Sequence, residues 1–154
     1  MMVNTLPANE ECNCFAVRAA ARHVSQSYDQ FLAPTGLRTT QLSILTKLKR
    51  EGPLTINTLA EGMVMDRTTL GRNIRPLERD GLIRIERVAS DRRAKELHLT
   101  KAGEKRVQAA LKRWSQAQAR VETVFGAKRA ADLRALLRAA VASQFAPAEQ
   151  FTDR

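Results

Sequence analysis

The feature of this sequence that most constrains its fold is a change in hydrophobic period between residues 57 and 99. Apolar residues first recur every three or four positions, in two blocks, which predicts two amphipathic helices. Apolar and charged residues then alternate in Leu82–Arg87 and again in Leu97–Leu99, around a polar tip at Ala89–Arg93. Because alternation is the period of a half-buried strand, these runs predict a β-hairpin. The helical blocks carry Leu59, Ala60 and Met63, and then Leu70, Ile74 and Leu77.

Local signals place the ends of the two helices. Leu54–Ile56 is expected to be a short extended piece, and Asn57 is a candidate N-cap for the first helix. Asp66 is the candidate N-cap for the second helix, where its negative charge suits a helix N-terminus, and Gly81 is expected to end that helix. Pro76 lies inside it and predicts a bend or a looser last turn. Two helices joined by a tight turn, the second with a basic outer face, indicate a helix-turn-helix followed by a wing.

Longer helices are expected on both sides of this motif. One runs from about Glu10 to Leu32, and either Thr39 or Thr40 caps the next. Thr100 is expected to cap a long helix that ends near Val124, and a last helix spans about Ala127 to Phe145. The first and last helices each carry an apolar face that the small central motif cannot cover, which predicts a two-fold helical dimer. The alternative is that these helices fold back on their own domain.

Composition narrows the classes of partner and reaction. The formal net charge of +10 favours a polyanion such as DNA, RNA or an acidic membrane. No run of 18 apolar residues predicts a membrane span, and the N-terminus lacks the pattern of a secretory signal. Cys12 and Cys14 are too close together to staple a fold, so a reducing, cytoplasmic compartment is expected. No phosphate loop, nucleophile elbow or cluster of metal ligands is found, so we expect no enzyme, cofactor or metal site.

The same segments resemble the MarR family of regulators. The hairpin resembles that family's wing signature, with Ser90–Ala94 at the tip and Leu97–Gly103 leading into the next helix. Leu59-Ala60 and Leu77–Leu82 also match the family's helix-turn-helix. The resemblance covers about Cys14–Ala142 and implies winged helix-turn-helix dimers, mostly repressors, many released from DNA by a small ligand or by oxidation.

The predicted fold is therefore mainly α with a small β-wing, a winged helix-turn-helix whose terminal helices form a homodimer interface. A single MarR-type domain is expected over residues 1–154. Within it, 36–99 would be the DNA-binding region, and 10–35 and 100–146 would be the helical dimerisation region.

The outward residues of the second helix and the wing tip are the predicted DNA contacts. Arginine offers a fork of donors that matches the O6 and N7 atoms of guanine, and arginine also suits a narrow minor groove. By resemblance, Arg93 would enter the minor groove while Asp91 orients the tip through a salt bridge. Gly71 presents bare backbone, either for close approach to the groove or as a neutral surface glycine. The predicted set is Arg67, Thr68, Thr69, Arg72, Asn73 and Arg75 on the helix, and Arg92, Arg93 and Lys95 on the wing.

The N-terminal cysteines suggest one form of regulation. The segment after Cys14 resembles the OhrR branch of the family, whose members sense organic hydroperoxides with a cysteine held by neighbouring tyrosines. Tyr28 matches one of those tyrosines, whereas Arg18 and Thr39 stand at the other two positions. Redox sensing by Cys14, with Cys12 as a further thiol, is one interpretation. The alternatives are a small aromatic ligand, or no ligand at all with Cys14 as a small apolar residue.

The function predicted from the sequence is sequence-specific binding of double-stranded DNA by a transcriptional regulator. A homodimer would read a pseudo-palindromic operator, acting as a repressor released by a small ligand or by an oxidant. The alternative is a non-specific architectural nucleic-acid-binding protein. An RNA-binding module is disfavoured because aromatic residues make up only 5% of the chain.

Overall fold

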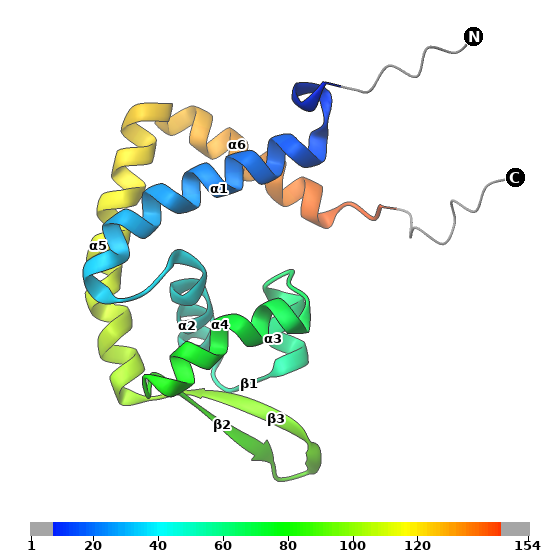
Figure 1. The fold of residues 1–154 in the computed structure, drawn as a ribbon, viewed down its shortest axis with the longest axis vertical. Helices are drawn as coiled ribbons and strands as arrows, with labels where there is room; N and C mark the ends of the chain where they lie inside the picture. The colour runs from blue at the N-terminus through cyan, green and yellow to red at the C-terminus, as the bar shows by residue number, and fades with distance from the viewer. Residues whose placement is uncertain (1–7, 146–154) are drawn as a thin grey trace, which may run out of the picture. The chain divides into compact units, whose positions relative to one another are not determined.

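The computed structural model of the protein describes residues 8–145. These residues fall into two compact units, 8–117 and 118–145, and each is described by itself. Figure 1 shows the elements in chain order along the colour ramp. The helices are α1 (Asn13–Leu32), α2 (Thr39–Glu51), α3 (Ile56–Gly62), α4 (Arg67–Arg79), α5 (Lys101–Phe125) and α6 (Ala127–Ala142), with short 3-10 turns at Asn9–Glu11 and Ala33–Thr35, and the strands are β1 (Leu54–Thr55), β2 (Ile83–Val88) and β3 (Asp91–Leu99).

The fold is mainly helical with one small antiparallel sheet, as the sequence predicts. The sheet has the order β1-β3-β2, so the hairpin of β2 and β3 gains a short third strand. Leu54 of β1 lies opposite Leu97 of β3, which gives the short extended piece before α3 its hydrogen-bonding partner. The strands β2 and β3 project as a two-stranded wing beyond the helices of the first unit (Figure 1). Their turn is at Ala89-Ser90, so Asp91 and the residues after it already belong to β3.

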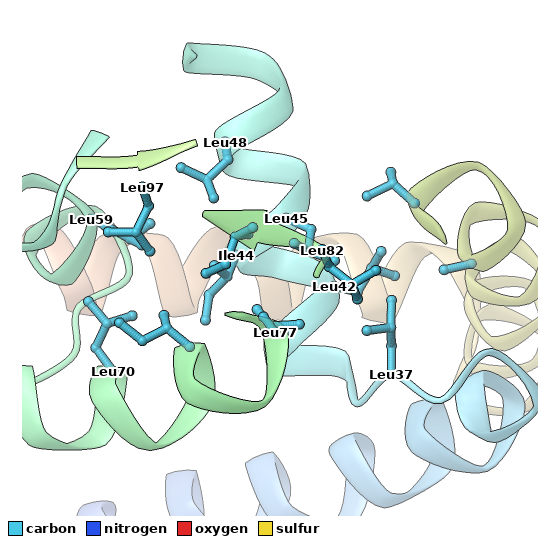
Figure 2. Close-up of a cluster of buried hydrophobic side chains, with 14 of the residues drawn as sticks. Leu37, Leu42, Ile44, Leu45, Leu48, Leu59, Leu70, Leu77, Leu82 and Leu97 are labelled. Carbon is cyan, nitrogen blue, oxygen red and sulfur yellow. The ribbon is translucent and has the colours of Figure 1, made fainter. Parts of the chain in front are cut away.

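The core of the first unit is a cluster of leucines contributed by α2, α3, α4 and the sheet (Figure 2). Leu45 on α2, Leu59 on α3 and Leu70 on α4 are fully buried. Leu97 of β3 is also fully buried, which ties the wing to the helix-turn-helix. Burying leucine side chains of this kind stabilises a fold by about 1.5–3 kcal/mol each, so the core holds α4 and the wing as one body.

Two of the expected helix caps are wrong. The helix α2 begins at Thr39, and neither threonine caps it with its side chain. The carboxamide oxygen of Gln41 instead accepts a hydrogen bond from the Arg38 N–H at 3.0 Å. The carboxylate of Asp29, on α1, accepts one from the Thr39 N–H at 2.7 Å. A side chain on the preceding helix therefore satisfies an N–H group at the start of α2.

The start of α3 also differs from the expected one. Its N-cap is Thr55, whose hydroxyl accepts a hydrogen bond from the Thr58 N–H at 3.2 Å. Asn57 lies inside the first turn, where it cannot serve as the cap. The pairing of β1 with β3 explains the shift, because it holds Thr55 in the extended conformation that an N-cap requires.

The helix α4 is close to its predicted limits. Asp66 is its N-cap, and Gly81 follows its end with a φ of +69°, in the left-handed region that glycine adopts without strain. The Leu82 N–H donates to the Leu77 carbonyl at 2.9 Å, which closes the helix end. Pro76 lies in the last turn of the helix, and α4 continues only to Arg79.

The junction between the wing and α5 depends on close backbone contact. The hydroxyl of Thr100 accepts a hydrogen bond from the Gly103 N–H at 3.0 Å, which confirms Thr100 as the cap of α5. The same hydroxyl donates to the Gly81 carbonyl at 2.7 Å. A Cβ at Gly103 would lie 2.2 Å from the carbonyl oxygen of Leu82. Only glycine therefore lets α5 begin this close to the start of β2.

The second unit comprises the end of α5 and the helix α6. Within it, Arg134 pairs with Glu122 at 3.4 Å, and the Arg129 guanidinium stacks 4.4 Å from the centre of the Phe125 ring. Most of the large apolar side chains of α6 stay exposed, and Ala130 is the buried residue of that helix. No helix within residues 8–145 is both long and apolar enough to cross a bilayer.

Candidate nucleic-acid interface

The N-terminus of α4 is held by two hydrogen bonds between Asp66 and Thr69. The Asp66 carboxylate accepts one from the Thr69 N–H at 2.8 Å and another from the Thr69 hydroxyl at 2.6 Å. The side-chain bond from Thr69, reinforced by the backbone bond, lowers the pKa of the Asp66 carboxyl below its ordinary value. Asp66 therefore stays ionised at neutral pH and fixes the point at which α4 begins.

The outer face of α4 carries exposed cations. Leu70, Ile74 and Leu77 are buried on its inner face, so the helical repeat turns the basic residues outward. Arg67, Arg72 and Arg75 are all exposed, and within the described part of the chain none of them forms an ion pair with a carboxylate. Their guanidinium donors are thus available to an external acceptor such as a phosphate or a base edge.

Three further predicted contacts lie on the same helix but differ in what they can offer. Thr68 is exposed at the first turn. The Thr69 hydroxyl already donates its proton to Asp66, so it can only accept from a new partner. The side-chain amide of Asn73 donates to the Thr69 carbonyl at 2.9 Å, along the flank of the helix. Thr68 is therefore the freest of the three, and Asn73 is the most restrained.

The wing tip is irregular, and its charged residues are exposed. The register between β2 and β3 shifts after Arg87, so Arg92 and Arg93 lie in a bulge near the turn. The Asp91 carboxylate accepts a hydrogen bond from the Arg93 N–H at 2.9 Å. Asp91 therefore contacts the tip through a hydrogen bond to the backbone and not through the expected salt bridge, because it has no ion pair among the described residues.

The wing also carries a candidate contact that the sequence reasoning missed. Arg87 lies directly across from Lys95 in the hairpin, and both side chains are exposed. Like charges at opposed positions destabilise a sheet, so this pair costs stability unless an anion neutralises it. The alternation of apolar and charged residues around Leu97 could have predicted this contact, because that alternation places Arg87 and Lys95 on one face of the predicted hairpin.

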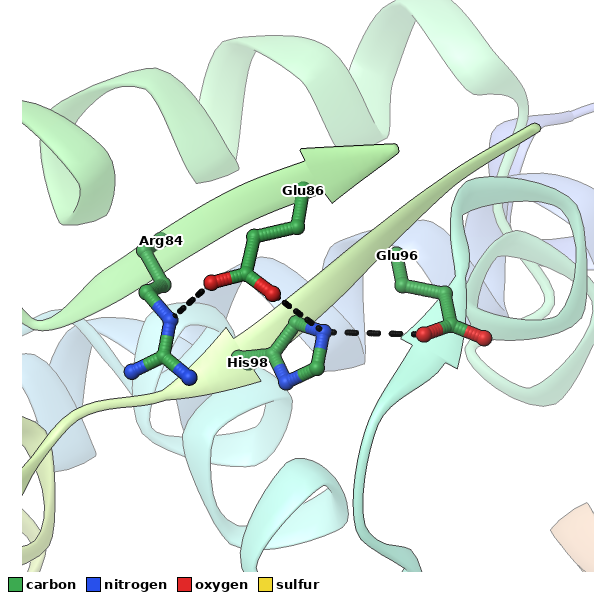
Figure 3. Close-up of polar contacts among 4 residues, drawn as sticks. All are labelled: Arg84, Glu86, Glu96 and His98. Carbon is green, nitrogen blue, oxygen red and sulfur yellow. Dashed lines mark hydrogen bonds and ion pairs between the residues drawn. The ribbon is translucent and has the colours of Figure 1, made fainter. Parts of the chain in front are cut away.

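The opposite face of the wing is partly acidic (Figure 3). Arg84 hydrogen-bonds Glu86, and this bond lowers the pKa of the Glu86 carboxyl. The His98 Nε2 atom lies 3.5 Å from an oxygen of Glu86 and 3.5 Å from an oxygen of Glu96. Arg84 is thus already paired with a carboxylate, and two carboxylates would repel a phosphate approaching this face. The free cations of the wing lie at its tip and in the pair of Arg87 and Lys95.

The residues proposed for thiol sensing are spread along α1. Both cysteines are free and exposed. The sulfur of Cys12 is the N-cap of α1 and accepts a hydrogen bond from the Phe15 N–H at 3.4 Å. Tyr28 is half-buried in the same helix, 14 positions after Cys14, which is about 21 Å along a straight helix. The fold therefore does not bring Cys14 and Tyr28 together within one chain.

Comparison with known proteins agrees with this geometry. The model of the MarR family matches residues 37–95, which contain the helix-turn-helix and most of the wing. The HTH-type transcriptional regulator YwoH of Bacillus subtilis (strain 168) is 31% identical over 90 residues. That match covers 58% of this chain and 65% of YwoH, so the chain spans just under two thirds of this curated relative.

Solved structures extend the likeness beyond that segment. The transcriptional regulator MosR of Mycobacterium tuberculosis, crystallised in complex with DNA, is 37% identical with a TM-score of 0.74, over 88% of this chain and 100% of the MosR chain. Overoxidised AbfR, solved bound to DNA, is 28% identical with a TM-score of 0.62, over 67% of this chain and 79% of AbfR. The chain therefore belongs to the MarR family and has the winged helix-turn-helix fold of its transcriptional regulators.

Proposed function

We propose that the protein is a sequence-specific DNA-binding transcriptional regulator that binds its operator as a homodimer. The observation that carries the proposal is the row of exposed arginines on α4, which have no carboxylate partner among the described residues. A helix with such a face fits the major groove, where guanidinium groups hydrogen-bond guanine. MosR, a relative at 37% identity, was crystallised in complex with DNA, which supports DNA binding by this chain.

The wing supplies the second set of contacts. Arg92 and Arg93 lie at the tip of the hairpin and enter the neighbouring minor groove, whose negative potential attracts guanidinium. Arg87 and Lys95, which lie on the hairpin next to the tip, bind phosphates of the DNA backbone. Because the wing and α4 share one core, a single docking geometry serves both. Base contacts from α4 specify the sequence, and phosphate contacts position the protein.

Dimerisation is supported by the apolar side chains that the described chain leaves exposed. Almost all of the large ones lie on α1, α5 and α6, including Val17, Trp114 and Leu136. Apolar surface on this scale marks an interface, and a two-fold copy is the economical way to cover it. Two recognition helices then read half-sites about 34–36 Å apart, so the operator is an imperfect palindrome.

Selection of bound duplexes from a random pool tests this function. We expect one imperfect palindrome to be enriched and to stay bound against a large excess of random DNA. Equal affinity for the selected duplex and a scrambled one would instead establish a non-specific architectural protein. A footprint limited to one half-site would refute the homodimer.

The regulator is proposed to repress transcription and to be released by a small ligand or by thiol oxidation. The exposure of both free cysteines favours oxidation, because an oxidant in solution can reach both thiols. Titration of the operator complex with an organic hydroperoxide separates the two signals. Release that Cys14→Ser or Cys12→Ser abolishes establishes a thiol sensor. Release that both variants retain, or no release at all, refutes it and leaves a small aromatic ligand as the signal to screen for.

Repression has its own test. The protein is added to an in vitro transcription reaction on a template that carries the selected palindrome within a promoter. We expect less transcript at protein concentrations that fill the site, and more transcript would identify an activator.

A further inference from the structure

Gly71 lies in the second turn of α4 without a structural reason in the free protein. A Cβ built at this position meets no atom within 4 Å. Its backbone is not in the left-handed region, which distinguishes it from Gly81 with a φ of +69°. Glycine is the least favourable residue after proline inside a helix. Neither packing nor backbone conformation therefore explains why this position lacks a side chain.

The neighbours of Gly71 are the predicted DNA contacts. Residues three and four positions apart share a helix face, so Thr68 and Arg67 lie one turn before Gly71, and Arg75 and the buried Ile74 lie one turn after it, which places Gly71 at the edge of the exposed face. Arg67 and Arg75 are exposed and carry no ion pair within residues 8–145. Gly71 thus forms a notch of bare backbone between two free guanidinium groups.

We propose that Gly71 is the point at which the backbone of α4 comes closest to the floor of the major groove, with the edge of a base pair in contact with the notch. This inference rests on the proposed function, because it assumes that α4 reads DNA. A Cβ would hold the base edge farther from the helix axis, by at most about 1.5 Å, the length of a carbon–carbon bond. Hydrogen bonds from Arg67 and Arg72 to bases tolerate only a few tenths of an ångström. A side chain at residue 71 therefore prevents the hydrogen bonds to the bases, whereas flexible side chains still bind the phosphates.

The test compares Gly71→Ala and Gly71→Leu with the wild-type protein. Thermal unfolding, affinity for the selected palindrome and affinity for a random duplex are measured for each. We expect Gly71→Ala to raise Tm, to weaken binding to the palindrome at least tenfold and to leave binding to random DNA within about twofold. Gly71→Leu is expected to weaken specific binding further. Ser43→Ala is the matched control, because Ser43 is exposed inside α2, away from the reading surface, and should not change either affinity.

Each other outcome overturns the inference. A lower Tm for Gly71→Ala would mean that the glycine is required for folding. Unchanged binding to the palindrome would mean that the groove floor does not reach residue 71, and equal losses on both duplexes would indicate a general defect. Failure of the proposed function is distinguishable, since the wild-type protein itself would then show no preference among duplexes.

Discussion

Arg93 shows how a neighbouring residue on the wing can hold the backbone of a residue whose side chain stays exposed. Its backbone N–H is held by Asp91, while its guanidinium is exposed and has no ion pair among the described residues. We expect Arg93→Ala to weaken operator binding more than tenfold and to leave the dimer folded, because a minor-groove contact is lost. The slope of log affinity against log salt concentration should become shallower by about one unit if the contact also neutralises a phosphate.

Fluorescence anisotropy at several salt concentrations measures both the affinity and this slope, with Arg50→Ala on the exposed side of α2 as the control. An unchanged midpoint at physiological salt would refute the role.

Asp66 carries a prediction about stability and pH. Its folded-state pKa is lowered by the hydrogen bonds from Thr69, so its contribution is fully present above the pKa of the unfolded chain. The contribution is lost as pH falls through the lowered pKa of the folded state. We expect Asp66→Ala to lower Tm by a few degrees at pH 7, and the difference from wild type to shrink towards pH 3. Asp66→Asn, which keeps a cap acceptor without the charge, should lose less. A Tm difference that is independent of pH would contradict the assignment.

At the level of elements, the start of α5 depends on two residues, Thr100 and Gly103. Thr100 ties the helix start to the Gly81 carbonyl, and Gly103 lets the Leu82 carbonyl approach where a Cβ would lie. We expect Gly103→Ala to destabilise the fold by about 1–3 kcal/mol, the usual cost of overpacking. Urea unfolding measures it, and Gly71→Ala is the matched comparison, because the same change in open space should stabilise by about 0.5–1 kcal/mol. Equal effects at the two positions would show that helix propensity alone determines the change in the free energy of unfolding.

In the assembled molecule, the exposed apolar side chains of α6 are expected to contact the partner copy. Leu136 is 70% exposed and Val141 is 64% exposed on α6. A protein that stays monomeric would tolerate a charge there, whereas a buried charge in a dimer interface is costly. We expect Leu136→Glu to be monomeric at micromolar concentration by sedimentation and to bind the palindrome at least tenfold more weakly. Ala131→Glu, on the opposite side of α6, is the control that should remain dimeric. A dimeric Leu136→Glu protein, or a monomeric wild type, would exclude this interface.

The order of the elements and the N-caps of α4 and α5 could be predicted from the amino-acid sequence alone. The change from a helical to an alternating period located α3, α4 and the hairpin, because each period reports which face of an element is buried. Asp66 and Thr100 were predicted as caps because their partners lie only three residues ahead. The basic face of α4 could be predicted for the same reason, since a helix repeat converts spacing into direction.

Contacts between residues that are distant in the chain depend on how the folded elements pack. Asp29 holds the Thr39 N–H from a different helix, and β3 holds the strand that sets Thr55 as the cap of α3. The pairing of Arg87 with Lys95 depends on the register of the hairpin. Such contacts form when packing of the shared core brings separate elements together. The spacing of residues along the chain does not encode the distance in space between residues of different elements.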